Sequence, residues 1–393
     1  MKKWLLFSLV FLLSWTAQTQ AQRVEQEIDS RGFSGELQKA WEESGIPAVN
    51  FGFITREGQY YSQSFGHAVW SEEAALTADH IFRIASMTKA LTSVAVLQLW
   101  EQGKVDLDAM VASFIPGIDS IPILTDEGNL VAASRPITLR NLLTHTSGFS
   151  YAMFDQRLAN FVRPDNWPHP DYPRVAEPGE QWIYSTSTDW AGKVVEAVSG
   201  LDLEAYLREH ITGPLGMDHT WFNVPDSLQH LIVSIGTRLE EPSDTFREYP
   251  GRVPREPVKE YSGGGGLFSS LNDYLKFLAC ILNEGELGGK RILNEATVDL
   301  MFRDELPGVL NLDPEEMADN SRMAHSLSWA IQLVDNDFGR KAGSAYWSGY
   351  FNTYYSIDRH SGVAVVVMAN YLPFLEPGIL GLYKTFESLV RGE

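Results

Sequence analysis

The chain has 393 residues, of which 44% are hydrophobic and 21% charged, a composition typical of a folded globular protein. Its formal net charge of -20 argues against nucleic acid and anionic membrane surfaces as partners, because both repel an acidic protein. A single cysteine, Cys280, excludes an internal disulfide. Its place in an apolar segment predicts a buried side chain rather than a nucleophile.

The first 21 residues are organised like a secretory signal. Lys2 and Lys3 precede the apolar stretch Trp4–Trp15, which is too short to span a bilayer comfortably, and Ala21 ends a small-residue cleavage site. We expect cleavage after Ala21, export to a secreted or periplasmic location, and no other membrane contact. An uncleaved N-terminal anchor is the alternative.

Two strands are expected near each end of the chain. Ala48–Thr55 and Tyr60–Gly66 surround a Glu-Gly turn, and Tyr350–Ile357 and Gly362–Met368 surround a second turn. Because the intervening segments are mainly helical, the economical arrangement is one antiparallel sheet built from both chain ends and flanked by helices.

The sequence therefore predicts one mixed α/β (α+β) domain over residues 22–393. Its α/β part covers about 22–110 and 262–393, and a mainly helical part covers about 111–261. We find no internal repeat, and no His, Cys or acidic cluster with the spacing of metal ligands. No metal and no cofactor are expected.

One short motif, Ser86-x-x-Lys89, stands at the start of an expected helix that ends at Gly103. Residues three apart lie on the same side of a helix. A serine hydroxyl is a weak nucleophile until a neighbour takes its proton, and a lysine whose pKa is lowered by burial or nearby positive charge can do so. Alone the motif is weak evidence, because an exposed lysine on an amphipathic helix is the commoner explanation.

The middle of the chain alternates helices and loops. Thr138 is a plausible N-cap for a helix over Ile137–Phe149, and His145 near its end is more often a cap partner than a catalytic base. Residues 150–180 are rich in proline and aromatic side chains and predict a long loop of the kind that forms binding walls. A helix over Trp190–Ser199 follows.

A run of four glycines, Gly263–Gly266, precedes a helix that starts with a capping signal at Ser270. Such a run either permits a close approach of the backbone to another group or forms a flexible turn, and the sequence alone leaves both readings open.

Three separated motifs become informative together: Ser86-x-x-Lys89, Tyr184-Ser185-Thr186 and Trp347-Ser348-Gly349. Three further segments accompany them in order: Leu142–Gly148, Pro214–Met217 and Gly263–Phe268. The set resembles the serine β-lactamase and penicillin-recognising family, and most of all class C β-lactamase-like hydrolases and the family VIII carboxylesterases. The resemblance covers nearly the whole mature chain and implies the β-lactamase-like fold.

The resemblance implies a role for each matching residue. Ser86 would be the acylated nucleophile, and Lys89 would share and shuttle its proton. Tyr184, as phenolate or as a relay with Lys89, would be the general base and later the acid. The backbone N–H groups of Ser86 and Tyr350 would form the oxyanion hole.

The remaining motif residues, Thr186, Trp347, Ser348 and Gly349, would contact the substrate. Thr186 stands where the family commonly has Asn, and Trp347 stands where it commonly has Lys or His. Both departures weaken the case for amide substrates with a free carboxylate, because Trp lacks the cation that pairs with it. Lys341-Ala342-Gly343 is a rival for the third motif, but its distance from Asp358 favours Trp347.

These observations predict a secreted serine hydrolase that works through an acyl-enzyme, most plausibly a carboxylesterase for short or medium acyl esters. Aromatic side chains of the 150–182 segment, with Trp347, would form an apolar wall. A β-lactamase or D-amino-acid peptidase acting on cell-wall-type amides is the alternative enzyme. A non-catalytic penicillin-recognition-like binding domain is the alternative of another class. The partner is a small ester or amide; the natural substrate and the oligomeric state stay open.

Overall fold

The structure, a computed structural model, describes residues 33–239, 245–306 and 323–392. The predicted signal segment and its cleavage site lie outside these residues. No helix in the described part is both long and apolar enough to cross a membrane.

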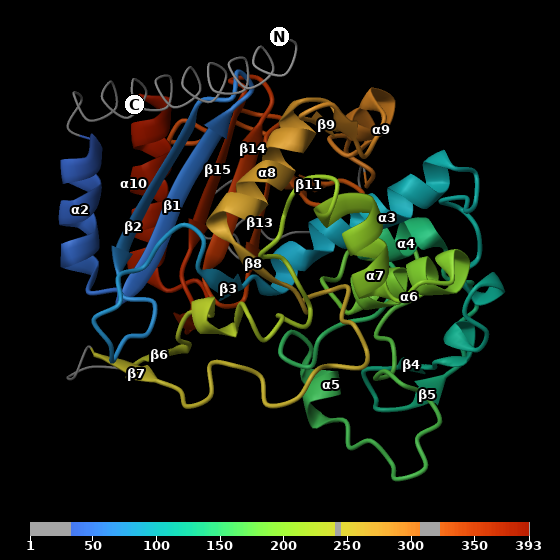
Figure 1. The fold of residues 1–393 in the computed structure, drawn as a ribbon. Coiled ribbons are helices and arrows are strands. Elements are labelled where there is room, and N and C mark those ends of the chain that lie inside the picture. The colour runs from blue at the N-terminus through green and yellow to red at the C-terminus, as the bar shows by residue number, and fades with distance from the viewer. Residues whose placement is uncertain (1–32, 240–244, 307–322, 393) are drawn as a thin grey trace.

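The centre of the molecule is an antiparallel sheet with strand order β11-β12-β13-β14-β15-β1-β2 (Figure 1). Its strands are β1 Ala48–Thr55, β2 Tyr60–Gly66, β11 Met323–His325, β12 Ala330–Gln332, β13 Ala345–Gly349, β14 Thr353–Asp358 and β15 Val363–Met368. Strand β1 lies between β2 and the C-terminal strand β15, with Asn50 opposite Met368. The predicted sheet built from both chain ends is therefore confirmed.

Both faces of this sheet are covered by helices. The helices are α2 Phe33–Ser44, α3 Thr88–Glu101, α4 Leu139–Leu143, α5 Gln156–Asn160, α6 Ser187–Ser199, α7 Leu203–Leu207, α8 Leu271–Leu282, α9 Glu295–Leu300 and α10 Pro377–Arg391. Because side chains alternate along a strand, Val365 and Val367 pack in the cluster with α2 and α10, whereas Ala364 and Val366 pack in the cluster that contains α8. Figure 1 shows α2 and α10 on one side of the sheet and α8 on the other.

Short strands join the loops around this core. They are β3 Ile81–Arg83 with β8 Phe268–Ser270, β4 Ile123–Leu124 with β5 Leu130–Val131, β9 Glu286–Leu287 with β10 Lys290–Arg291, and the group β6 Gly236–Arg238, β7 Phe246–Glu248 and β16 Tyr371–Leu372. The β3–β8 pair holds the segment just before Ser86 beside the segment that follows the glycine run. Cys280 is buried and free, as predicted.

Helix α3 carries the Ser-x-x-Lys motif and is buried on all sides over Thr88–Leu99. It packs against α6 of the helical region and joins the core cluster that contains α8. The commoner explanation of the motif, an exposed lysine on an amphipathic surface helix, is therefore wrong, because Lys89 is only 3% exposed.

Two predicted elements differ in the structure for local reasons. The expected strand Tyr350–Ile357 is interrupted by a turn, because Asn352 has a positive φ of 65° and β14 begins only at Thr353. The expected helix Ile137–Phe149 has the predicted Thr138 cap but is only five residues long, since His145 has a φ of 56°. Strands β11 and β12, three residues each, were not predicted.

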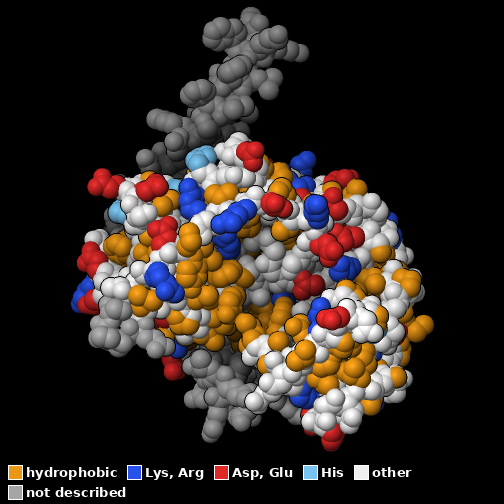
Figure 2. Space-filling model, turned by 90° about the horizontal axis from the view of Figure 1, so that it is seen from below, with side chains coloured by type: hydrophobic (Ala, Val, Ile, Leu, Met, Phe, Trp, Pro, Cys, Tyr) orange, Lys and Arg blue, Asp and Glu red, His pale blue; other side chains and the backbone are white. Residues whose placement is uncertain are grey.

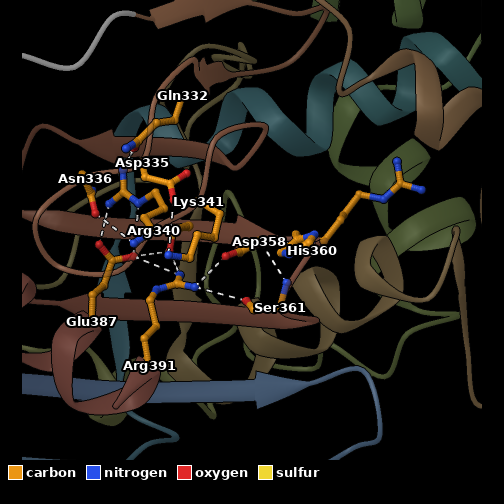
Figure 3. Close-up of polar contacts among 12 residues, drawn as sticks. Gln332, Asp335, Asn336, Arg340, Lys341, Asp358, His360, Ser361, Glu387 and Arg391 are labelled. Atoms are coloured by element: carbon orange, nitrogen blue, oxygen red, sulfur yellow. Dashed lines mark hydrogen bonds and ion pairs between the residues drawn. The ribbon is translucent and has the colours of Figure 1, made fainter. Parts of the chain in front are cut away.

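Helix α10 is tied to the sheet by a buried polar cluster (Figure 3). Arg340 donates to Glu387 Oε2 at 2.6 Å and to the hydroxyl of Tyr383 at 3.0 Å. Arg391 pairs with Asp358 Oδ2 at 2.8 Å, beside Glu387. Two arginines and two carboxylates therefore balance one another out of contact with water.

Candidate active site

The backbone is bent immediately before Ser86. Ala85 has a φ of 42°, in the left-handed region that residues with a side chain avoid, and it opens the 3₁₀ turn Ala85–Met87 that leads into α3. Left-handed backbone at a non-glycine residue persists only where the surroundings impose it, and it gathers at functional sites. Here it places Ser86 on the turn at the start of the buried helix.

The ammonium of Lys89 is the centre of the polar contacts around Ser86. Its Nζ lies 3.4 Å from Ser86 Oγ, 3.2 Å from the hydroxyl of Tyr151 and 2.6 Å from the carbonyl oxygen of Gly264. It also lies 4.7 Å from the ring centroid of Tyr184, within cation–π range. The structure thus brings together the serine, lysine and tyrosine that the sequence motifs suggested.

The charge state of Lys89 differs from the sequence expectation. Burial alone lowers its pKa, but the electrostatic effect of Tyr184, Tyr151 and Asp189 outweighs burial and leaves the pKa raised above its ordinary value. A buried lysine surrounded by oxygen atoms stays an ammonium. The expectation of a lowered lysine pKa is therefore wrong, and Lys89 is a donor to Ser86 in the resting site rather than a ready base.

The hydroxyl of Tyr184 is buried and makes no hydrogen bond of ordinary geometry, although it faces the Lys89 ammonium. Its ring lies 5.2 Å from Trp347 and 5.5 Å from Tyr151, measured between ring centroids. A buried polar group without a partner is uncommon and calls for an explanation. Here the hydroxyl is free to exchange a proton with a reacting group.

His145 supports Tyr184 from behind. The rings are 4.8 Å apart, and the His145 Nδ1 accepts the backbone N–H of Ser185 at 3.3 Å. Burial, aided by the charges of His325 and Lys89, holds the pKa of His145 well below its ordinary value. His145 is therefore neutral and orients the Tyr184 segment; that it takes no direct part in chemistry stays a prediction.

Tyr350 follows the strand that reaches the nucleophile. At Gly349, the last residue of β13, an added Cβ would lie 2.3 Å from the carbonyl oxygen of Ile84 and from Thr353 Oγ1. Only glycine permits this approach. The end of β13 therefore lies against Ile84, which is two residues before Ser86 in the chain. Strand β13 thus contacts the turn that carries Ser86, and the role of the Tyr350 N–H in an oxyanion hole stays a prediction.

The predicted substrate contacts are placed unequally. Trp347 faces Tyr184 and lies 5.8 Å from the ring of His325, while Ser348 is half-buried on the same strand. Thr186 departs from its predicted role, because its hydroxyl donates to Asp171 Oδ2 at 2.7 Å instead of being free for a substrate. Asp171 also accepts from the Trp190 indole at 3.0 Å, so it binds the long loop to α6.

The rival residue Lys341 lies away from this site. It pairs with Asp335 at 3.3 Å in the loop before β13 (Figure 3). That loop enters β13 at Ala345, opposite Ile357, whereas the nucleophile meets the other end of the strand at Gly349. Gly349 lies four residues beyond Ala345 along the strand, a span of roughly 13 Å.

The aromatic residues of the predicted wall divide into two groups. Tyr151 and Phe154 contact the ring of Tyr184, with centroid distances of 5.5 and 6.1 Å. Phe161 instead packs against Trp167 and Tyr172, within the loop itself. The face of the molecule with β3, α5 and β6 is hollowed, and hydrophobic side chains gather around the hollow (Figure 2).

Sequence reasoning missed three residues that the structure brings to the site. His325, at the end of β11, contacts Trp347; Asp189 in α6 contacts Gly264; and the Tyr151 hydroxyl accepts from Lys89 in addition to lining the wall. The only sequence signal for these contacts was the glycine run. Within the described residues, no group of three or more His, Cys, Asp or Glu side chains could hold a metal ion.

Comparisons with known proteins agree with this geometry. A family model described as Beta-lactamase matches residues 33–387. The monacolin J acid methylbutanoyltransferase of Aspergillus terreus is 32% identical over 348 residues, covering 81% of this chain and 83% of that protein. A lovastatin esterase of Penicillium rubens is 29% identical over 334 residues, covering 73% and 79%.

A solved structure is similar over the same length. The unliganded simvastatin synthase from Aspergillus terreus superposes with a TM-score of 0.82 and 30% sequence identity, covering 90% of this chain and 96% of that chain.

Proposed function

Because the chain belongs to the beta-lactamase family, we propose that it is a serine hydrolase that hydrolyses carboxylic esters with short or medium acyl chains through an acyl-enzyme on Ser86. One observation carries this proposal. The Lys89 ammonium contacts Ser86 Oγ and faces Tyr184, whose buried hydroxyl has no other partner. Nucleophile, cation and proton acceptor therefore meet at one point, which is what acyl transfer needs.

The reaction follows from these positions. Tyr184, as phenolate or as a relay with Lys89, accepts the proton of Ser86 as its Oγ attacks the ester carbonyl. Lys89 stabilises the negative charge as it passes from the Tyr184 oxygen to Ser86 Oγ and the reacting carbonyl. The N–H groups of Ser86 and Tyr350 receive the oxyanion, and Tyr184 returns the proton to the departing alcohol. Water then attacks the acyl-enzyme by the same steps in reverse order.

The surroundings of the site support a neutral ester rather than a β-lactam or a peptide with a free carboxylate. Trp347 occupies the third motif and offers an apolar face and one N–H. The hydroxyl of Thr186 is engaged with Asp171, and Lys341 is paired with Asp335 elsewhere. A substrate carboxylate has no counterpart in the third motif, so its desolvation would be uncompensated.

Acyl transfer to an alcohol is the second candidate function. It is favoured by the similarity to the methylbutanoyltransferase of Aspergillus terreus, which is as extensive as that to the esterase. The chemistry is shared up to the acyl-enzyme; only the group that attacks it differs, water in one case and an alcohol in the other.

The test is hydrolysis of p-nitrophenyl acetate and butyrate by residues 22–393, beside Ser86→Ala and a chromogenic cephalosporin. Ester turnover that is lost in Ser86→Ala, with little cephalosporin turnover, supports the proposal. An added primary alcohol that diverts the acyl group to a new ester supports the second candidate. Absence of ester turnover, or turnover unchanged in Ser86→Ala, would refute the nucleophile assignment and favour a narrow peptide substrate or a binding role.

We further propose that the enzyme works outside the cytoplasm, after cleavage at Ala21. The supporting observation is the charged and apolar arrangement of residues 1–21. Mass spectrometry of the protein recovered from the producing cells tests this, since cleavage leaves Gln22 as the first residue. An intact Met1 in the recovered protein contradicts it.

A further inference from the structure

The glycine run Gly263–Gly266 makes hydrogen bonds at the site that the proposed mechanism does not use. The N–H of Gly264 donates to Asp189 Oδ1 at 3.0 Å, and the carbonyl oxygen of Gly264 accepts from Lys89 Nζ at 2.6 Å. The hydroxyl of Ser262 donates to the same Asp189 oxygen at 2.5 Å. A chain of contacts thus runs from the Asp189 carboxylate through the backbone of one residue, Gly264, to the Lys89 ammonium.

Glycine is required at this point by the closeness of the groups. A Cβ added to Gly264 would lie 2.5 Å from Asp189 Oδ2, and one added to Gly263 would lie 2.8 Å from the carbonyl oxygen of Thr188. Thr92 Oγ1 also donates to the carbonyl oxygen of Gly263, which fixes the run against α3. The run is therefore a close approach of backbone to side chain, not a flexible turn.

We propose that Asp189 is a positioning residue, whose carboxylate holds the Gly264 backbone so that its carbonyl oxygen lies against the Lys89 ammonium beside Ser86. The inference rests on the proposed function of Ser86, Lys89 and Tyr184. Asp189 touches neither the serine nor the tyrosine through a hydrogen bond in the structure, so it acts through Lys89 and the Gly264 peptide.

Asp189 is the carboxylic acid among the side chains that face Lys89; the other two are phenols. Lys89 is faced by Tyr151 from the loop after α4, by Tyr184 from the segment before α6, and by Asp189 from α6 itself. Neutral His145 lies behind Tyr184. Replacing the carboxylate of Asp189 by an amide therefore removes a charge from this group and keeps a hydrogen-bond acceptor in place.

Asp189→Asn separates this electrostatic role from a structural one. The asparagine Oδ1 can still accept the Gly264 N–H, but the negative charge is gone. Removing a negative charge weakens proton binding by the Lys89–Tyr184 pair, so the pH profile of kcat/KM for p-nitrophenyl butyrate moves to lower pH, by at least about half a unit. KM changes less than threefold, because Asp189 does not contact the ester.

The matched control is Glu196→Gln, on the same helix, where the side chain accepts the N–H of Leu203 at 3.0 Å. It also removes one negative charge and keeps an acceptor, but it does not contact the glycine run. Its pH profile should coincide with that of the unmodified enzyme. Asp189→Ala, which removes both charge and acceptor, should lower kcat at least tenfold at the pH optimum.

The outcomes separate this inference from the proposed function. A downward shift in Asp189→Asn that is absent in Glu196→Gln supports it. A shift in Asp189→Asn no larger than in Glu196→Gln overturns it, provided that the unmodified enzyme hydrolyses the ester and Ser86→Ala does not. If the unmodified enzyme does not hydrolyse the ester, or if Ser86→Ala still does, the proposed function itself is refuted. If Asp189→Ala does not fold, the Asn variant decides alone.

Discussion

Replacing Glu387 by Gln should strongly destabilise the fold without changing the chemistry. The side chains of Arg340 and Glu387 are 2% and 0% exposed and lie 2.6 Å apart. Glu387 also accepts from Ser356 and lies 3.5 Å from Arg391. The cluster is neutral because Glu387 and Asp358 balance two arginines; the substitution preserves the shape and leaves one buried positive charge uncompensated.

The magnitude follows from that uncompensated charge. Breaking a buried ion pair by removing one partner lowers the free energy of unfolding by about 3–5 kcal/mol. In the unmodified protein the carboxylate of Glu387 more than offsets the effect of burial and keeps the pKa of Arg340 raised. Without that carboxylate burial acts unopposed by Glu387, but a guanidinium is not deprotonated in proteins, so the buried charge and its penalty remain. We therefore expect Glu387→Gln to lose about 3–5 kcal/mol.

Urea unfolding followed by tryptophan fluorescence measures the loss, and Glu286→Gln is the control. Glu286 pairs with Arg291 at 2.8 Å, but both side chains are more than 40% exposed, so its loss should be below about 1 kcal/mol. The kcat of folded Glu387→Gln should match that of the unmodified enzyme, since the cluster lies at the opposite end of β13 from Ser86. A loss similar to that in Glu286→Gln would refute the reasoning.

Three further predictions concern the site. Ala85→Gly relieves the strain of the left-handed backbone and should raise the free energy of unfolding by about 0.5–1 kcal/mol. It should also lower kcat, because Ser86 is held less firmly. Urea unfolding and ester assays measure the two effects, and a lower free energy of unfolding contradicts the prediction. Burial lowers the pKa of His325 to about 4 from 6.5, so the unfolded chain binds a proton first as the pH falls between these values. The free energy of unfolding should decline over that pH window by up to about 3 kcal/mol, and by less in His325→Phe. Urea unfolding midpoints at pH 7 and pH 4.5 measure the difference. Thr186→Val breaks the hydrogen bond to the Asp171 carboxylate and should cost about 1–3 kcal/mol in thermal unfolding, whereas an unchanged melting temperature would show that this contact is not formed.

The sheet was predictable because its signals are local. Strands β1 and β2 have the predicted bounds, since alternation and a Glu-Gly turn define both. The caps at Thr138 and Ser270 were also readable, because each side chain accepts the N–H three residues later. By contrast, the break at Asn352 was not predictable, as it depends on bonds that this side chain makes to Tyr371 and Pro373.

The candidate site was predictable only where motifs carry it. Ser86, Lys89 and Tyr184 come together as the motifs suggested, although their roles stay a prediction. The raised pKa of Lys89 was predictable only in part: its largest raising cause, Tyr184, is a motif residue, but Tyr151 and Asp189 meet the lysine only in the folded chain. The same holds for Thr186: its motif position is visible in the sequence, but its hydrogen bond to the long loop is not.

The position of β1 in the sheet also determines the order in which the molecule can be completed during synthesis. The β1–β2 hairpin leaves the ribosome early, but the other edge of β1 has no partner until β15 is made, at the opposite end of the chain. An apolar edge strand that waits this long can pair with other chains, and closing so long a loop slows folding. Because β13 and Tyr350 arrive with these last strands, Ser86 is synthesised long before the segment that we propose completes its oxyanion hole. A nascent or truncated chain therefore lacks the complete proposed site until the final segment joins the sheet.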